Sequence, residues 1–158
     1  MATVARVKKD GTLWGWGYNF RGQLGDGTNT NKNIPTLISL NNINKLSLSG
    51  FSSSHKMLLK TDGSMWGWGQ NSYGQLGNEN ITTDQNIPTK IGTETDWKDL
   101  STGGYHTLAL KTDGSLWSWG TNVFGELGIG KAFYYTPTLA KPIVEITASS
   151  RKTFCPDR

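Results

Sequence analysis

The chain repeats a short pattern in which tryptophans alternate with small residues. It reads LWGWG at 13–17, MWGWG at 65–69 and LWSWG at 116–120. Alternation with a period of two predicts a β-strand whose bulky side chains share one face. An Asp-Gly pair stands just before each stretch and a further apolar run stands before the pair. The pattern therefore predicts three β-hairpins.

The Asp-Gly pairs also predict how the hairpin strands pair. If Asp113 and Gly114 form a two-residue turn, counting outward places Leu110 opposite Trp117 and Leu108 opposite Trp119. Each hairpin then has one face with two aliphatic side chains and two tryptophans. The same count assigns to such faces Met57 and Leu59 with Trp66 and Trp68, and Ala5 and Val7 with Trp14 and Trp16.

The hairpins belong to a longer unit that recurs through the chain. Residues 8–25, 60–77 and 111–128 align without gaps, and Gly11 and Gly63 are 52 residues apart. A period of this length is typical of propellers and other repeat architectures. We expect a single repeat domain over residues 1–158, divided into units at about 1–50, 51–103 and 104–150 with a C-terminal tail at 151–158.

A hairpin face with two tryptophans needs a covering surface, since each ring can bury on the order of 150–250 Å². A lone hairpin cannot cover such a face, but a neighbouring repeat can. The small residues beside the tryptophans allow sheets to approach closely. The sequence therefore predicts an all-β fold of about three β-propeller blades, each a four-stranded antiparallel sheet.

Two motifs carry a family resemblance. Trp-Gly-x-Asn is followed by Gly-Gln-Leu-Gly in the first two units and by Gly-Glu-Leu-Gly in the third. This combination resembles the regulator of chromosome condensation repeat, whose members typically form seven-bladed propellers. The residues that make up this structural signature are Trp14, Trp16, Gly22, Leu24, Gly25, Trp66, Trp68, Gly74, Leu76, Gly77, Trp117, Trp119, Gly125, Leu127 and Gly128.

The number of repeats raises the question of how the blades are completed. Seven blades need roughly 350 residues, and closed propellers have at least four blades. Residues 3–7 match the first strand of a hairpin, and residues 144–150 match the strand that precedes one. We expect these halves to meet between chains, head to tail, or to dock on a larger assembly. The alternative is that the chain is a fragment of a longer propeller.

Composition and charge exclude several classes. The net charge is +4, but the basic residues are scattered, so we do not expect a nucleic-acid surface. One cysteine, Cys155, excludes an internal disulfide and a cysteine-based zinc cluster. No apolar segment has the length of a signal-peptide core or a membrane span. We expect a soluble protein without membrane contact, and the sequence indicates no compartment.

The residues that could carry chemistry have structural interpretations. His55 and His106 occupy the same place in successive units, which favours a hydrogen bond within a loop over catalysis. The aspartates of the Asp-Gly pairs suit turn geometry, and the loop GDGTNTN at 25–31 lacks the spacing of a calcium-binding loop. We expect no catalytic residue, no cofactor and no metal.

The remaining hypothesis is a non-enzymatic module that acts through protein–protein contacts or structural assembly, including a virion component. Loops that differ between repeats are the natural contact surface. The aromatic residues Phe133, Tyr134 and Tyr135 are the first candidates there, and Trp97 is either a contact residue or a plug between blades. The resemblance also implies two alternatives: guanine-nucleotide exchange on a small GTPase, and inhibition of an enzyme.

Overall fold

A computed structural model describes residues 3–49, 54–78, 83–130 and 134–140, which form eleven strands and no helix. The strands are β1 (Thr3–Val7), β2 (Leu13–Gly17), β3 (Lys32–Ile38), β4 (Ile43–Leu48), β5 (His55–Lys60), β6 (Met65–Gly69), β7 (Gln85–Ile91), β8 (Trp97–Thr102), β9 (His106–Lys111), β10 (Leu116–Gly120) and β11 (Tyr134–Leu139).

The strands form three antiparallel sheets in which sequence neighbours pair. The orders are β1-β2-β3, β4-β5-β6-β7 and β8-β9-β10-β11. The all-β prediction is confirmed, and two of the three sheets have the expected four strands. Each four-stranded sheet starts with a strand from the end of the preceding sequence unit, so sheets and sequence units are out of phase.

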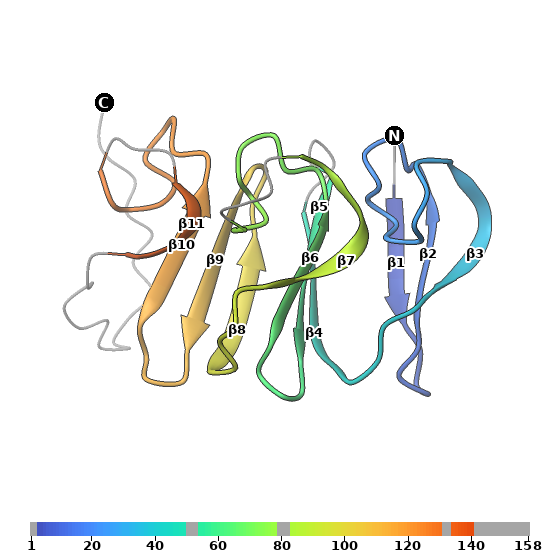
Figure 1. Ribbon diagram of the computed structural model, residues 1–158, viewed down its shortest axis with the longest axis horizontal. Coiled ribbons are helices and arrows are strands. Elements are labelled where there is room, and N and C mark those ends of the chain that lie inside the picture. Colours follow the sequence, from blue (N-terminus) through green and yellow to red (C-terminus); the bar gives the residue numbers. More distant parts are fainter. Residues whose placement is uncertain (1–2, 50–53, 79–82, 131–133, 141–158) are drawn as a thin grey trace, which may run out of the picture.

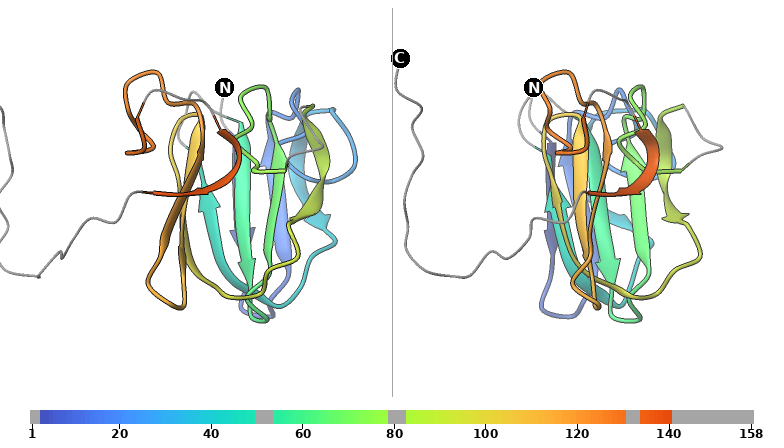
Figure 2. Two further views of the ribbon diagram at one scale, coloured as in Figure 1. Left: turned by 60° about the vertical axis from the view of Figure 1, so that its left-hand side comes forward. Right: turned by 90° about the vertical axis from the view of Figure 1, so that its left-hand side faces the viewer.

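The three sheets, hereafter blades 1 to 3, stand face to face along the longest axis of the molecule (Figure 1). The described parts of the connections β2–β3, β6–β7 and β10–β11 lie along one side of this stack, at the top of Figure 1, and β3, β7 and β11 bend away from the other strands (Figure 2). Apolar side chains fill two seams: the first between blades 1 and 2, and the second between blades 2 and 3.

The register of the hairpins differs from the expected one by one residue. Trp117 lies opposite Ala109 and Trp119 opposite Thr107. The Lys111 amide donates to the Ser115 carbonyl, so the loop has three residues and ends at a glycine with φ +87°. That is a type I turn with a glycine bulge, which Asp-Gly supports as well as the two-residue turn.

The prediction of which side chains share a face is therefore wrong, because a shift of one residue moves every side chain to the other face. In each blade the tryptophans lie on one side, here called the tryptophan face. The aliphatic residues assigned to them lie on the other, here called the aliphatic face. The misassigned residues are Ala5, Val7, Met57, Leu59, Leu108 and Leu110.

Each seam joins the tryptophan face of one blade to the aliphatic face of the preceding blade. In the second seam, Trp119 of blade 3 and Met57 of blade 2 belong to one buried cluster. In the first seam, Trp68 of blade 2 lies in a cluster with Ala5 and Leu13 of blade 1. Stacking of repeats thus buries Trp68 and Trp119 completely, as expected, but against the other kind of face.

Candidate interaction surfaces

The Gly-Gln/Glu-Leu-Gly segments form tight loops, here called elbows, that follow the inner hairpins. In blade 2 the elbow is Gly74–Gly77. The Asn71 side-chain oxygen accepts from the Leu76 amide at 3.0 Å, and the Gln75 side-chain oxygen accepts from the Tyr73 amide at 2.9 Å. Blades 1 and 3 repeat both bonds. Each elbow is therefore shaped by its own signature residues.

A tryptophan from the following blade is latched onto each inner elbow. The Trp68 indole nitrogen donates to the Gln23 carbonyl at 3.1 Å, and the Trp119 indole nitrogen donates to the Gln75 carbonyl at 3.0 Å. Both rings are fully buried. Buried indole groups need such an acceptor. Each of these two bonds, here called a latch, joins a tryptophan to the elbow of the preceding blade, and together they fix the spacing of the blades.

The last glycine of the inner elbows makes room for the latch. A Cβ atom on Gly25 would lie 2.8 Å from the Trp68 indole nitrogen, and one on Gly77 would lie 2.6 Å from that of Trp119. Both glycines have φ of +77°, which other residues rarely adopt. The signature glycines are thus required by backbone conformation and by packing across the seam.

The residue just before each inner elbow, here called the elbow tip, also reaches the following blade. Arg21 forms an ion pair with Asp84 at 3.0 Å, and the Tyr73 ring lies 5.0 Å from the ring of Tyr105. The counterpart in blade 3 is Phe124, which is 90% exposed. Among the described residues, no blade lies where its contact would be.

The outer aliphatic face, on blade 3, is correspondingly open. Leu108, Leu110 and Leu116 are only half-buried, whereas their counterparts in blade 2 are fully buried. Nothing described lies within 4 Å of a Cβ atom placed on Gly128. The three blade 2 counterparts are Met57, Leu59 and Met65.

The outer tryptophan face, on blade 1, is open in the same way. Trp16 occupies the position of Trp68 and Trp119 but is half-buried, and no described acceptor bonds its indole. In blades 2 and 3, strands β4 and β8 pair with the first strand of the hairpin. The corresponding edge of β1 has no partner strand among the described residues.

The two seams differ beside the latch tryptophan. Lys56 lies opposite Trp68 and is 2% exposed, and burial lowers the pKa of its ammonium group to about 8. Its nitrogen is 3.4 Å from the His55 carbonyl oxygen. Thr107 lies opposite Trp119, and its hydroxyl donates to the Gln75 carbonyl at 2.8 Å.

The two histidines begin strands β5 and β9, in blades 2 and 3. His55 is fully buried, and burial lowers its pKa to about 3, so its ring is neutral. Its Nε2 lies 3.3 Å from the Thr107 hydroxyl across the second seam. His55 thus has a hydrogen-bonding contact, but it joins two blades from strand β5 instead of lying within a loop as predicted.

The aspartates of the Asp-Gly pairs close their turns. Asp113 accepts bonds from the Ser115 hydroxyl and amide, at 2.6 and 2.8 Å, and these bonds lower the pKa of its carboxyl group. Asp10 and Asp62 make the same bonds. In the described part of the chain no three His, Cys, Asp or Glu side chains gather as a metal site would require.

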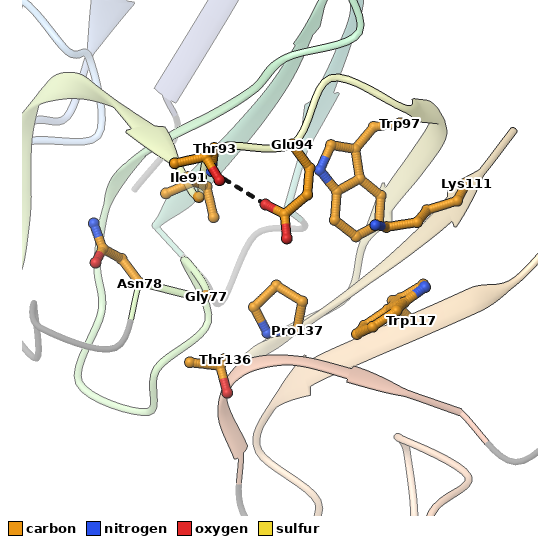
Figure 3. A pocket seen from close by; sticks show the side chains of 11 residues that line it. Gly77, Asn78, Ile91, Thr93, Glu94, Trp97, Lys111, Trp117, Thr136 and Pro137 are labelled. Carbon is orange, nitrogen blue, oxygen red and sulfur yellow. Dashed lines mark hydrogen bonds between the residues drawn. The ribbon is translucent and has the colours of Figure 1, made fainter.

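A shallow groove opens on the rim of each seam. The groove of the second seam has a volume of about 370 Å³, and Lys111 and Trp117 from blade 3 face Glu94 from the β7–β8 loop across it (Figure 3). The Lys111 nitrogen lies 5.0 Å from the centre of the Trp117 ring and 3.2 Å from Asp96. The first seam has a groove of the same size, where Lys60 lies over Trp66.

The predicted contact residues lie in different parts of the structure. Trp97 is the first residue of β8, is 4% exposed and packs edge-on against Trp117 at 6.1 Å, so it fills the second seam as the alternative interpretation expected. Tyr134 and Tyr135 begin strand β11, and Phe133 lies outside the described residues.

Within the described residues, no helix is long and apolar enough to cross a membrane.

The missed residues share one signal. Lys56, Phe124 and the leucines of blade 3 stand out only when the three units are aligned and each is compared with its counterparts. Val4, Lys56 and Thr107 occupy the same position in the three aligned units, and Lys56 alone of these three is charged. The alignment of the units singles out Lys56 by its charge, but not by its burial.

Antiparallel sheets stacked face to face and latched through tryptophans define this chain as a set of β-propeller blades. It belongs to the family of the regulator of chromosome condensation (RCC1) repeat, whose profile matches residues 10–59, 62–110 and 97–126.

Similar proteins contain many more residues. The chain is 34% identical over 129 residues to the ultraviolet-B receptor UVR8 of Arabidopsis thaliana, covering 80% of this chain and 29% of UVR8. It is 32% identical to the mitochondrial RCC1 domain-containing protein RUG3 of the same plant, covering 78% of this chain and 28% of RUG3. The chain thus spans less than a third of each relative.

Solved structures support the same fold. A chain in the structure of Kap60 bound to yeast RCC1 (Prp20) matches with a TM-score of 0.80 at 21% identity, over 89% of this chain and 35% of that one. Human WBSCR16 matches with a TM-score of 0.74 at 22% identity, over 87% of this chain and 35% of that one. These matches confirm a partial propeller.

Proposed function

We propose that this chain is a non-enzymatic assembly module that works through protein–protein contacts, first of all head to tail with further copies of itself. The observation that carries the proposal is the contrast between inner and outer faces. Trp68 and Trp119 of the inner seams are fully buried, whereas Trp16 and the aliphatic face of blade 3 are open. Exposed apolar faces of this kind mark interaction sites.

The strand edge of blade 1 supports the same proposal. A strand edge with free amides and carbonyls is a template for another strand, and proteins usually cover it. Strands β4 and β8 cover this position in blades 2 and 3. Head-to-tail association gives blade 1 a neighbour on the open side, and it generates a ring if the rotation closes or a filament if it does not.

The mass of the chain in solution tests this function. Native mass spectrometry and light scattering at micromolar concentration are expected to show a multiple of 17.3 kDa. A folded monomer over the whole concentration range would contradict self-assembly. Circular dichroism on the same samples shows whether a monomeric sample is folded.

The kind of larger assembly is a finer part of the proposal. A virion component is one form of it, and electron microscopy of the assembled protein tests that form by its symmetry. The resemblance also implies two other functions, exchange on a small GTPase and enzyme inhibition. In both, the partner would be a different protein and not a second copy of this chain. A pull-down with a small GTPase and with a β-lactamase separates them from self-assembly.

A further inference from the structure

We infer that the two outer faces bind each other between two copies of the chain, with Trp16 of one copy latched onto the elbow Gly125–Gly128 of the other. This inference rests on the proposed self-assembly and specifies the seam that produces it. Both halves of the seam are present on one chain, so the partner that fits is a second copy.

The donor half of the latch is available on blade 1. Trp16 lies on the tryptophan face at the position of Trp68 and Trp119, and both of those donate to an elbow carbonyl at 3.0–3.1 Å. Trp16 is half-buried and its indole N–H has no acceptor among the described residues. A partly desolvated indole gains from an acceptor.

The acceptor half is available on blade 3. Glu126 stands where Gln23 and Gln75 stand in the inner elbows, and its carbonyl oxygen accepts no hydrogen bond from the described residues. The space over Gly128 is open, whereas the indole of the following blade fills the space over Gly77. The third elbow thus has the shape of the inner two without the ring that they hold.

The surfaces around the latch also match those of the inner seams. Leu108, Leu110 and Leu116 form the aliphatic face that a tryptophan face covers elsewhere in the chain. Burial of this apolar area provides the driving force for association. The rotation that relates blade 2 to blade 3 would then continue from one copy to the next.

The elbow tip identifies a second contact of this seam. Arg21 in blade 1 pairs with Asp84 in blade 2, and the counterpart of Asp84 in blade 1 is Asn31. The two counterparts make the same local bond, because Asn31 accepts from the Asn19 amide at 2.8 Å and Asp84 accepts from that of Asn71 at 2.9 Å. If the inferred seam follows the geometry of the first seam, Phe124 of one copy lies beside Asn31 of the next; in the second seam the counterpart Tyr73 contacts Tyr105.

A charge exchange at these two exposed positions tests the seam without changing the core. Phe124→Arg with Asn31→Asp reproduces the Arg21–Asp84 pair between copies, and Phe124→Asp with Asn31→Asp places two like charges there. Sedimentation equilibrium at low ionic strength should show at least tenfold weaker association for the like-charged variant than for the opposite-charged one. Added salt should reduce the difference, since the pairs are solvent-exposed.

Ser72→Asp with Asn31→Asp is the matched control. It has the same net charge as the like-charged variant, but Ser72 lies in blade 2, two residues before its elbow, and we expect association like that of the natural chain. A further variant, Trp16→Phe, keeps a smaller aromatic ring and removes the indole donor, and it should weaken association at least severalfold with an unchanged circular dichroism spectrum.

The outcomes distinguish failure of the inferred seam from failure of the proposed self-assembly. If the natural chain assembles and all variants assemble with equal affinity, the inferred seam is overturned while self-assembly through another surface stands. If the natural chain remains a folded monomer, self-assembly and the seam are both overturned. Weakening by Trp16→Phe and by the like-charged pair, but not by the control, supports the seam.

Discussion

The first and second seams have the same latch but different surroundings. In the first, the Gln23 carbonyl accepts from the Trp68 indole, and a buried ammonium group, Lys56, lies opposite that ring. In the second, the Gln75 carbonyl accepts from both the Trp119 indole and the Thr107 hydroxyl. The geometry of the latch is therefore compatible with a cation or a neutral donor beside it.

This difference shows which features of a seam are the same in both seams and which vary. The elbow, its last glycine and the indole recur in both seams, whereas the residue opposite the indole varies. A buried cation without a carboxylate partner destabilises the folded state. We therefore expect the second seam to be the more stable, and four changes test the comparison.

The largest effect is expected from removing a latch ring. Trp119→Ala leaves a large cavity in the second seam and should lower the free energy of unfolding by about 3–5 kcal/mol. Trp16→Ala is the matched control, because Trp16 is only half-buried. It should lower the stability clearly less when both are measured by chemical denaturation at a concentration where the chain is monomeric. Equal losses would contradict the role of the inner latch.

The next effect concerns the elbow glycines. Gly77→Ala and Gly128→Ala both place a side chain at a positive φ, at a cost of about 1–2 kcal/mol. Only the Cβ atom at position 77 meets an indole, at 2.6 Å. Overpacking there should add about 1–3 kcal/mol. Thermal unfolding of the two variants measures the difference, and identical melting temperatures would show that the seam adapts without cost.

A gain of stability is expected at the first seam. Lys56→Met removes the buried charge and should raise the free energy of unfolding at pH 7 by about 1–3 kcal/mol, since each unit of pKa shift corresponds to about 1.4 kcal/mol. The control is Lys98→Met, at an exposed lysine of strand β8. A loss of stability in Lys56→Met would mean that the ammonium group is well solvated.

Lys56 also makes the free energy of unfolding depend on pH. The pKa of Lys56 is about 8 in the folded chain and 10.5 without burial. Between these values the unfolded chain binds more protons, so the contribution of Lys56 makes stability rise as pH increases. The rise should be present in the natural chain and absent in Lys56→Met when denaturation is followed from pH 7 to pH 10.5.

The smallest effect belongs to the second donor of the second seam. Thr107→Val keeps the shape of the side chain and removes the hydroxyl, which donates to the Gln75 carbonyl and lies 3.3 Å from His55 Nε2. The loss should be about 1 kcal/mol, as for a typical hydrogen bond. Urea denaturation resolves a change of this size. No change would indicate that the Trp119 indole alone satisfies the carbonyl.

The sequence alone predicted the strands, the repeats and the blades. Alternation of tryptophan and glycine places β6 and β10 correctly, and residues 3–7 form strand β1 as expected. These features follow from local periodicity and from the requirement to bury tryptophans. Neither depends on knowing which blade lies beside which.

The register could not be predicted from Asp-Gly alone, because the pair suits two types of turn. The deciding interaction is the bond from the Ser115 amide and hydroxyl to Asp113, which closes the three-residue loop. A hydroxyl residue follows each Asp-Gly pair in the sequence, so this signal was available. The burial of Lys56 was not, since it depends on packing between blades.

The acceptor of every latch is a main-chain carbonyl, which every amino acid supplies. The elbow side chain turns back to its own loop instead, and Glu126 bonds the Phe124 amide as Gln75 bonds that of Tyr73. A new blade inserted by duplication of one unit would find a usable acceptor at once, without compensating mutations in its neighbours. Gene duplication and deletion can therefore change the number of blades in such a protein more easily than they can change the blade itself.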